Sequence, residues 1–293
     1  MGIERKLEMG AVNITTQPHS AEGYVRLLRA ATKIRLPAKI RGERYGIFSG
    51  FHREKGIPGE VRPVSGDIVL FSRIDPNLPW FNTTSDEFAS EEDIERVQIP
   101  DHLKPNSVKF AYVFFPEEHL AFFQGYDSDT GKYLTANVAK KFFEQTLNRD
   151  TLVESFGQVD VTTIPTDDAI QTALDLPQKN KMHLSFTVPN PDDDKLAEVE
   201  FQERLRLLKA RKKEEVYYSE SGESLQVDND LQTLVKIAAK NGSVVVSGRD
   251  EDGKPAIVNT KEHPWRVKEY FDDGIENLFD VMLRLAENVR KKF

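Results

Sequence analysis

The chain contains no cysteine. This absence excludes disulfide bonds, thiolate zinc sites, iron–sulfur ligation and cysteine nucleophiles, and it fits a reducing compartment. Long apolar runs are also missing: no segment approaches the roughly 18 residues that a membrane-spanning helix needs. The charged N-terminus, MGIERKLEMG, lacks the apolar stretch of a signal peptide. We therefore expect a cytoplasmic protein without membrane contact.

The common motifs of cofactor and metal chemistry are absent from the sequence as well. It has no Walker A loop, no dinucleotide-binding GxGxxG after a strand, no HExxH, no EF-hand loop and no GxSxG elbow. The histidines do not form pairs at metal-ligand spacing. We therefore expect no cofactor and no bound metal.

What the chain does contain is enough apolar material for a core under a strongly charged surface. Its 293 residues are 39% hydrophobic and 30% charged, with 18 Phe and a formal net charge of −8. This length suits one large or two medium domains. A polar stretch near residues 148–158 interrupts the periodic patterns, so we predict an N-terminal domain at 1–155 and a C-terminal domain at 156–293.

Apolar periodicity predicts an α+β fold, with antiparallel or mixed sheets and packed helices in two sub-domains. Strand 107–115, SVKFAYVFF, is apolar on both faces, which is typical of the centre of a sheet. In the first half we further predict strands at 6–16, 36–53 and 66–74, helices at 18–33 and 135–147, and a short helix that begins at the capping box Ser90-Glu91-Glu92-Asp93. In the second half we predict strands at 159–165 and 181–189, a hairpin of two strands at 243–249 and 255–260, and helices at 166–176, 194–215, 229–239 and 274–292.

Three features of the second half lead to specific expectations. The 274–292 helix carries one continuous apolar stripe, so we expect it to be amphipathic and to close the core. The 194–215 helix has two apolar faces, and the second is a candidate contact for a partner protein or a second copy. Asn241-Gly242 is expected to end the preceding helix as a left-handed cap.

The strongest electrostatic feature is a basic segment. Between Arg26 and Arg53 there are eight basic residues, the last of them Arg53, and the only acid is Glu43. Arginine forks bind phosphates in two-pronged fashion, so the segment is a candidate surface for RNA or DNA. The alternative is a solvated structural face that pairs with the acidic segment Asp75–Asp101. The candidate binding residues are Arg26, Arg29, Lys33, Arg35, Lys39, Arg41 and Arg44.

Three weaker patterns each have a structural explanation. Phe110–Phe115 matches the end of an RNA-recognition signature in which strand aromatics stack on bases, but a central strand is apolar for packing alone. Asp192-Asp193-Asp194-Lys195 superficially resembles a nuclease metal site, yet consecutive acids before a helix are explained by capping. His19 is the candidate general acid or base of a metal-independent ribonuclease, although a histidine at a helix start is more often a cap.

Several short stretches together resemble an uncharacterised bacterial domain-of-unknown-function family that occurs among phage-defence and mobile-element genes. The stretches are VNITT at 12–16, Pro18-His19, KIRGERYG at 39–46, Asp75-Pro76, Pro79-Trp80-Phe81, Pro189-Asn190-Pro191-Asp192 and Asn241-Gly242. The resemblance implies a context of bacterial antiviral defence and supplies no catalytic residues.

These observations favour a non-enzymatic protein. Our hypothesis is a sensor or adaptor of a phage-defence system that binds nucleic acid or a partner protein through the basic segment and the second face of the 194–215 helix. The alternative from a different class is the ribonuclease that uses His19.

Overall fold

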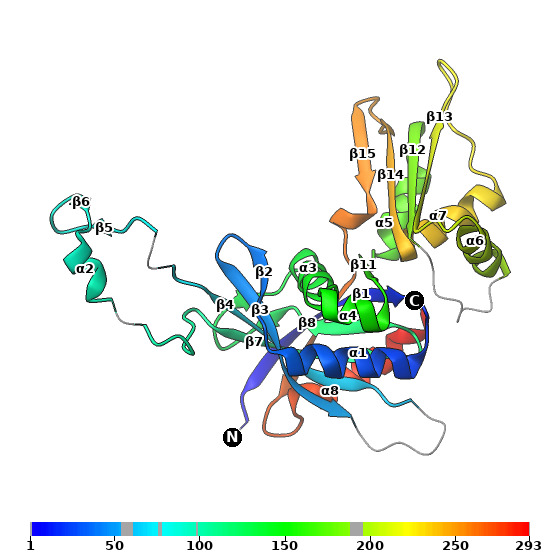
Figure 1. Cartoon of the computed structure of the whole chain (residues 1–293). Coiled ribbons are helices and arrows are strands. Elements are labelled where there is room, and N and C mark those ends of the chain that lie inside the picture. Colours follow the sequence, from blue (N-terminus) through cyan, green and yellow to red (C-terminus); the bar gives the residue numbers. More distant parts are fainter. Residues whose placement is uncertain (1, 54–60, 76–77, 98, 188–195, 293) are drawn as a thin grey trace.

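The described residues form two main antiparallel sheets, of eight and four strands, with helices packed against them (Figure 1), and two short two-stranded ribbons. The computed structural model describes residues 2–53, 61–75, 78–97, 99–187 and 196–292, with the backbone alone for 196–200 and 202. Every strand pairing within these ranges is antiparallel. The predicted α+β class is confirmed.

The larger sheet is organised around the long strand β1. The strand order is β11-β1-β8-β7-β4-β3-β2, and β16 pairs with the first part of β1 beside β11. Glu4–Gly10 pair with β16 and Val12–Thr16 pair with β11, so one strand carries two neighbours on the same side. The strands are β1 (Glu4–Thr16), β2 (Ala38–Arg41), β3 (Arg44–Arg53), β4 (Val64–Ser72), β7 (Val108–Phe115), β8 (Leu120–Gln124), β11 (Val159–Thr163) and β16 (Arg266–Asp272).

Strand β7 lies between β4 and β8, as its apolar sequence predicted. Phe110, Tyr112 and Phe114 face one core, and Val113 and Phe115 face the other. All of these side chains are buried. The base-stacking interpretation of this strand is therefore wrong, because its aromatic rings are already packed inside the protein.

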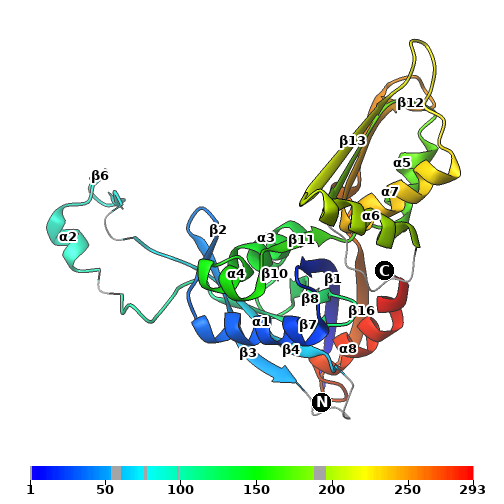
Figure 2. The same ribbon diagram turned by 45° about the vertical axis from the view of Figure 1, so that its right-hand side comes forward.

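Helices cover both faces of the larger sheet (Figure 2). Helices α1 (Ala21–Ile34), α3 (Ala136–Leu147) and α4 (Asp150–Phe156) supply side chains to the core on one face. Helix α8 (Leu278–Val289) and the 3₁₀ turn η2 (Arg290–Lys292) follow β16, and α8 packs on the other face. The helix predicted from residue 274 begins only at 278, yet its role in the core is confirmed.

Helix α1 forms where its sequence pattern predicts. The Ser20 side chain caps it by accepting a hydrogen bond from the Gly23 amide at 3.0 Å. Its five buried residues are the predicted apolar face: Tyr24, Val25, Leu27, Leu28 and Ala31.

Two predicted elements have different boundaries. Residues 36–53 form the hairpin β2–β3 and not one strand, because Gly42 adopts a φ of 52° at a tight turn. The predicted 194–215 helix is shorter: α6 (Leu196–Leu207) ends and β13 (Lys212–Tyr218) follows. The side chains of Leu196 and Val199 on its predicted second face lie outside the described residues.

An acidic arm projects between β4 and β7, at the left of Figure 1. It holds β5 (Phe81–Asn82), β6 (Glu87–Phe88) and α2 (Glu91–Glu95), whose predicted capping box is confirmed. The two ends of the arm lie side by side, because the Ser72 amide donates a hydrogen bond to the Pro105 carbonyl at 2.9 Å. Its acids are Asp75, Asp86, Glu87, Glu91, Glu92, Asp93, Glu95 and Asp101.

The smaller sheet has the order β13-β12-β14-β15 and its own core. Helices α5, α6 and α7 supply side chains to one face of it. The remaining elements are α5 (Asp167–Asp175), β12 (Gln178–Thr187), α7 (Asn229–Asn241), β14 (Gly242–Arg249), β15 (Pro255–Asn259), the 3₁₀ turn η1 (Thr260–Glu262), and a ribbon of β9 (Tyr126–Asp127) and β10 (Lys132–Tyr133) beside the larger sheet.

The smaller sheet is inserted between two strands of the larger one. The chain leaves β11 and returns into β16, and the Trp265 amide donates to the Ile164 carbonyl at 2.7 Å where the two crossings meet. The strand pairings therefore divide the chain differently from the predicted boundary at 155. Both β11 and β16 come after that boundary and pair with β1.

Gly242 is not the left-handed cap that the sequence predicted. Its φ of 178° is extended, and a Cβ there would lie 1.9 Å from the backbone oxygen of Ser185 on β12. Glycine is needed at this position because two backbones approach closely, not because of the backbone angle.

This difference gives a testable prediction for two asparagine substitutions. We expect Gly242→Asn to destabilise the protein by roughly 1–3 kcal/mol or more, since β12 must move. Gly253→Asn is the matched control: Gly253 has a φ of 75° and nothing within 4 Å of a Cβ, a setting that asparagine tolerates. Urea denaturation of both variants measures the difference, and an equal, small change in both would contradict the close approach.

Candidate functional site

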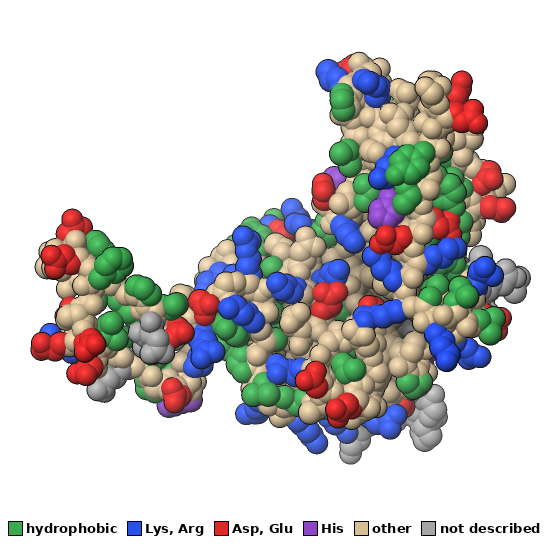
Figure 3. All heavy atoms as spheres, turned by 45° about the horizontal axis from the view of Figure 1, so that its top comes forward, with side chains coloured by type: hydrophobic (Ala, Val, Ile, Leu, Met, Phe, Trp, Pro, Cys, Tyr) green, Lys and Arg blue, Asp and Glu red, His purple; other side chains and the backbone are tan. Residues whose placement is uncertain are grey.

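The predicted binding residues lie on α1, on the connection that follows it and on the β2–β3 hairpin, and we refer to these seven residues together as the basic surface. All seven side chains of this surface are exposed: Arg26, Arg29, Lys33, Arg35, Lys39, Arg41 and Arg44. Lysine and arginine side chains gather over the body of the protein, whereas Asp and Glu side chains are prominent on the arm (Figure 3). The structure thus leaves every predicted cation available to solvent.

Local structure explains why these cations point outward. On α1, Arg26, Arg29 and Lys33 occupy the helix face opposite the buried one. On β2, the exposed Lys39 and Arg41 alternate with buried neighbours, as on any strand with one covered face. The helix leads at its C-terminal end into the hairpin, so both groups belong to one continuous stretch of chain (Figure 1).

Few carboxylates neutralise the basic surface. The Lys39 ammonium lies 3.4 Å from Glu43, and the Arg29 guanidinium stacks on the Phe51 ring at 5.0 Å. Within the described ranges, the other five residues of the surface form no ion pair. The ion pair of the surface is therefore local, and the acidic arm, where the alternative interpretation expected the partners, does not supply it.

Glu22 lies on α1 close to the basic surface, and its pKa responds to the positive charges there. Arg53 donates to both of its carboxylate oxygens, at 2.6 and 3.1 Å. This hydrogen bonding lowers the pKa of Glu22 below its usual value, and the charges of Arg26 and Arg29 add to the effect.

Arg149 is a basic residue of this region that the sequence analysis did not identify. Its guanidinium donates to the Leu36 carbonyl, on the connection between α1 and β2. Burial lowers its pKa. The contact joins positions 113 residues apart, so no local sequence pattern predicts it.

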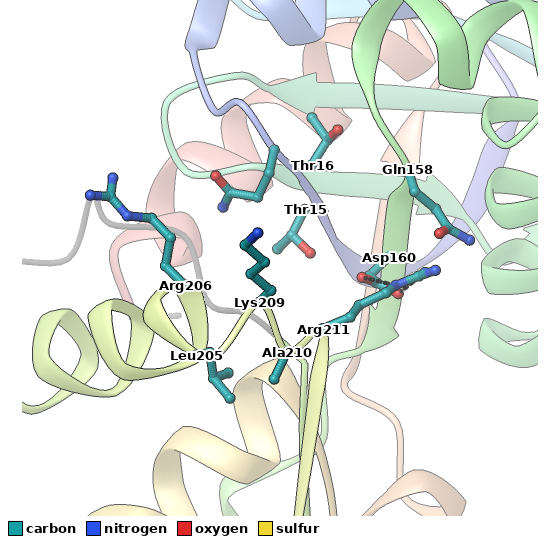
Figure 4. Close-up of a pocket in the computed structure, with 10 residues that line it drawn as sticks. Thr15, Thr16, Gln158, Asp160, Leu205, Arg206, Lys209, Ala210 and Arg211 are labelled. Atoms are coloured by element: carbon teal, nitrogen blue, oxygen red, sulfur yellow. Dashed lines mark hydrogen bonds and ion pairs between the residues drawn. The ribbon is translucent and has the colours of Figure 1, made fainter.

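A second site lies where the two sheets meet, in a cavity of about 360 Å³ that we call the inter-sheet pocket (Figure 4). It is lined from four places in the chain: the end of β1, the start of β11, the end of α6 and the turn into β13. The lining residues are Thr15, Thr16, Gln17, Gln158, Asp160, Leu205, Arg206, Lys209, Ala210 and Arg211.

The lining of the inter-sheet pocket carries more positive than negative charge. Arg211 donates to both oxygens of Asp160, at 2.6 and 3.2 Å, and so neutralises the one acid of the lining. Arg206 and Lys209 form no ion pair among the described residues. Two positive charges therefore remain beside the hydroxyl and amide groups of the wall, an arrangement that favours an anion.

A family model described as Domain of unknown function (DUF4747) matches residues 5–287. The chain belongs to this family. The match includes both sheets, the basic surface and every residue that lines the inter-sheet pocket. No curated protein matches the chain.

In this DUF4747 protein, His19 lies against Tyr24 and His119. Its Nδ1 is 3.2 Å from the Tyr24 hydroxyl, and the two imidazole rings meet edge to face at 4.8 Å. His119 and Tyr24 are buried, whereas His19 is half-buried. The ring cluster accounts for His19 as a packing residue, and its partly open position keeps the ribonuclease hypothesis testable.

The described ranges of the DUF4747 chain contain neither a clustered metal site nor a membrane-spanning helix. They hold no group of three His, Asp or Glu side chains placed to bind a metal ion. Their helices are all too short or too polar to cross a bilayer. The consecutive acids Asp192, Asp193 and Asp194 lie outside the described residues.

Proposed function

We propose that this protein is a non-enzymatic nucleic-acid-binding protein that uses its basic surface. The observation that carries the proposal is the exposure of seven cations on one continuous stretch of chain, with Glu43 as the only acid among them. Their sparse neutralisation leaves them free to replace the counterions of a phosphate backbone.

The spacing of the α1 cations supports contact with successive phosphates. Arg26, Arg29 and Lys33 extend over about 10 Å of helix axis. One strand of duplex DNA places a phosphate about every 3.4 Å along its axis, so this distance corresponds to roughly three phosphates. Five of the seven residues of the basic surface are arginines, whose planar forks suit two-pronged phosphate contacts.

The negative charge of the whole chain does not oppose short-range binding. The net charge is −8, but charges more than about 8–10 Å apart are screened at physiological salt. The acids of the arm therefore act weakly at the basic surface, whereas the cations of that surface act directly on a bound phosphate.

We further propose that the protein acts as a sensor or adaptor in bacterial antiviral defence. The support for this context is the sequence resemblance described above. A partner protein would find an apolar contact at the end of α6, where Leu207 and Leu208 are 82% and 63% exposed.

Charge reversal on α1 tests the binding function. We expect the triple variant Arg26→Glu, Arg29→Glu, Lys33→Glu to bind duplex DNA and single-stranded RNA much more weakly. The slope of log affinity against log salt should fall by about 2.7 on duplex DNA or about 2.1 on single strands. Fluorescence anisotropy with labelled oligonucleotides over a salt series measures both quantities.

The matched control changes the same amount of charge elsewhere. A second triple variant also reverses three exposed cations and alters the net charge equally: Lys236→Glu, Arg266→Glu, Lys291→Glu. This variant should bind like the wild type. Equal weakening in both triple variants would contradict a localised site, and unchanged binding after the α1 reversal would move the site elsewhere.

The ribonuclease alternative is tested with the same oligonucleotides. If the protein cleaves RNA in EDTA and His19→Ala abolishes cleavage, His19 acts as an acid or base and the non-enzymatic proposal fails. Binding without cleavage supports the proposal.

A further inference from the structure

The inter-sheet pocket has the features of a small-molecule site that is separate from the basic surface. Its volume, about 360 Å³, falls in the lower part of the usual range for ligand pockets, roughly 300–1,000 Å³. It lies between two units, where binding sites commonly occur. None of its lining residues belongs to the basic surface.

One wall is made by the paired strands β1 and β11. Thr15 lies opposite Asp160 in their register, and its side chain points into the pocket (Figure 4). The residue is only 6% exposed, and its hydroxyl forms no hydrogen bond within the described part of the chain. A hydroxyl that opens into a cavity without a protein partner is a group that water or a ligand can satisfy.

The neighbouring Thr16 is used differently. Its hydroxyl donates to the Phe156 carbonyl at 2.8 Å, which leaves its oxygen able to accept a hydrogen bond. The amides of Gln17 and Gln158 add donors and acceptors to the lining. This wall therefore offers neutral hydrogen bonds in both directions, the kind that recognise hydroxyl groups and base edges.

The opposite wall supplies the positive charge. Lys209 extends from the turn after α6 toward the threonines, Arg206 lies at the rim, and Arg211 is turned to Asp160 (Figure 4). Leu205 is buried and gives this wall an apolar part. A ligand here would contact cations at one end and neutral polar and apolar groups over the rest of its surface.

We propose that the inter-sheet pocket binds a phosphomonoester attached to a nucleoside. The phosphate lies at Lys209 and Arg206, and the nucleoside contacts Thr15, the glutamines and Leu205. A free nucleotide and the phosphorylated 5′ end of a strand both carry this chemistry. The proposal does not rest on the proposed function, because it involves different residues.

Calorimetry on the full chain tests the proposal with the four ribonucleoside 5′-monophosphates, adenosine and inorganic phosphate. We expect at least one monophosphate to bind below about 1 mM. Inorganic phosphate and the matching nucleoside should each bind at least about tenfold more weakly, because each makes only part of the contacts.

Substitutions in the pocket should weaken this binding without unfolding the protein. Lys209 has a φ of 52°, so Lys209→Asn removes the charge and keeps a side chain that tolerates the left-handed region. We expect Lys209→Asn and Thr15→Val each to reduce the affinity about tenfold, and the exposed-lysine control Lys236→Asn to leave it unchanged. Melting curves of the ligand-free variants verify that each is folded.

Two further measurements distinguish a free nucleotide from a strand end, and the inter-sheet pocket from the basic surface. A 5′-phosphorylated trinucleotide that binds at least about tenfold tighter than the monophosphate identifies a strand end, and the reverse order identifies a free nucleotide. The α1 triple variant should bind the monophosphate normally, so this proposal and the proposed function fail independently. No binding by any monophosphate, or binding that Lys209→Asn leaves unchanged in a folded protein, would overturn the proposal.

Discussion

A chain that ends at Asn277 should lose its cooperative fold. This truncation removes α8, which buries Val281, Met282 and Leu285 against the larger sheet. Full burial of such side chains stabilises a protein by about 1.5–3 kcal/mol each, and three of them together approach the roughly 5–15 kcal/mol of a whole domain. The truncation also uncovers the apolar face of β1, β7 and β8, which favours aggregation.

Circular dichroism, size exclusion and urea denaturation measure the effect of the truncation. The matched control ends at Arg290, which keeps α8 and the ion pair of Arg290 with Glu118. This control should unfold cooperatively, like the full chain. A chain of residues 1–277 that is monomeric and unfolds in one transition would show that α8 is dispensable.

Local sequence predicts the elements whose own apolar pattern determines their structure. The spacing of Tyr24, Val25, Leu27, Leu28 and Ala31 suits only a helix with one buried face, and α1 has that face. Strand β7 is apolar on both faces, and β7 lies inside the sheet. In these segments the hydrophobic period carries enough information, because side-chain burial is the main stabilising contribution.

Local sequence fails where a partner strand decides the structure. Lys212–Tyr218 is rich in charge, and the sequence pattern predicts a long helix over part of it. It is the edge strand β13, whose side chains alternate between exposed and half-buried because one face covers the small core. Gly42 likewise falls inside a continuous strand pattern, and only the pairing of β2 with β3 shows the turn.

The two candidate sites differ in the same way. The basic surface lies on one continuous stretch of chain, so counting charges in the sequence identifies all seven of its residues. The inter-sheet pocket combines four segments, and Thr15 and Lys209 are brought together only by the insertion of the smaller sheet. No spacing along the chain contains that information.

Isolated fragments should separate the two ways of dividing the chain. We expect residues 166–263 to fold alone, because every residue of the small core, from Ala173 to Val258, lies within this range. The ends of the fragment are adjacent in the full protein, where the Thr166 amide donates to the His263 carbonyl at 3.0 Å. Excision therefore leaves the paired strands of the smaller sheet intact.

Residues 1–155 should fail to fold, although they form the N-terminal domain that the sequence predicted. This fragment lacks β11 and β16, which pair with almost the whole length of β1, and it lacks α8. Urea denaturation of both fragments, monitored by circular dichroism, shows which of them unfolds cooperatively. If residues 1–155 and 156–293 each unfolded cooperatively while 166–263 did not, the boundary at 155 would be correct and the smaller sheet would depend on its neighbours. We expect the opposite result, because a core is stable only with the strands that enclose it.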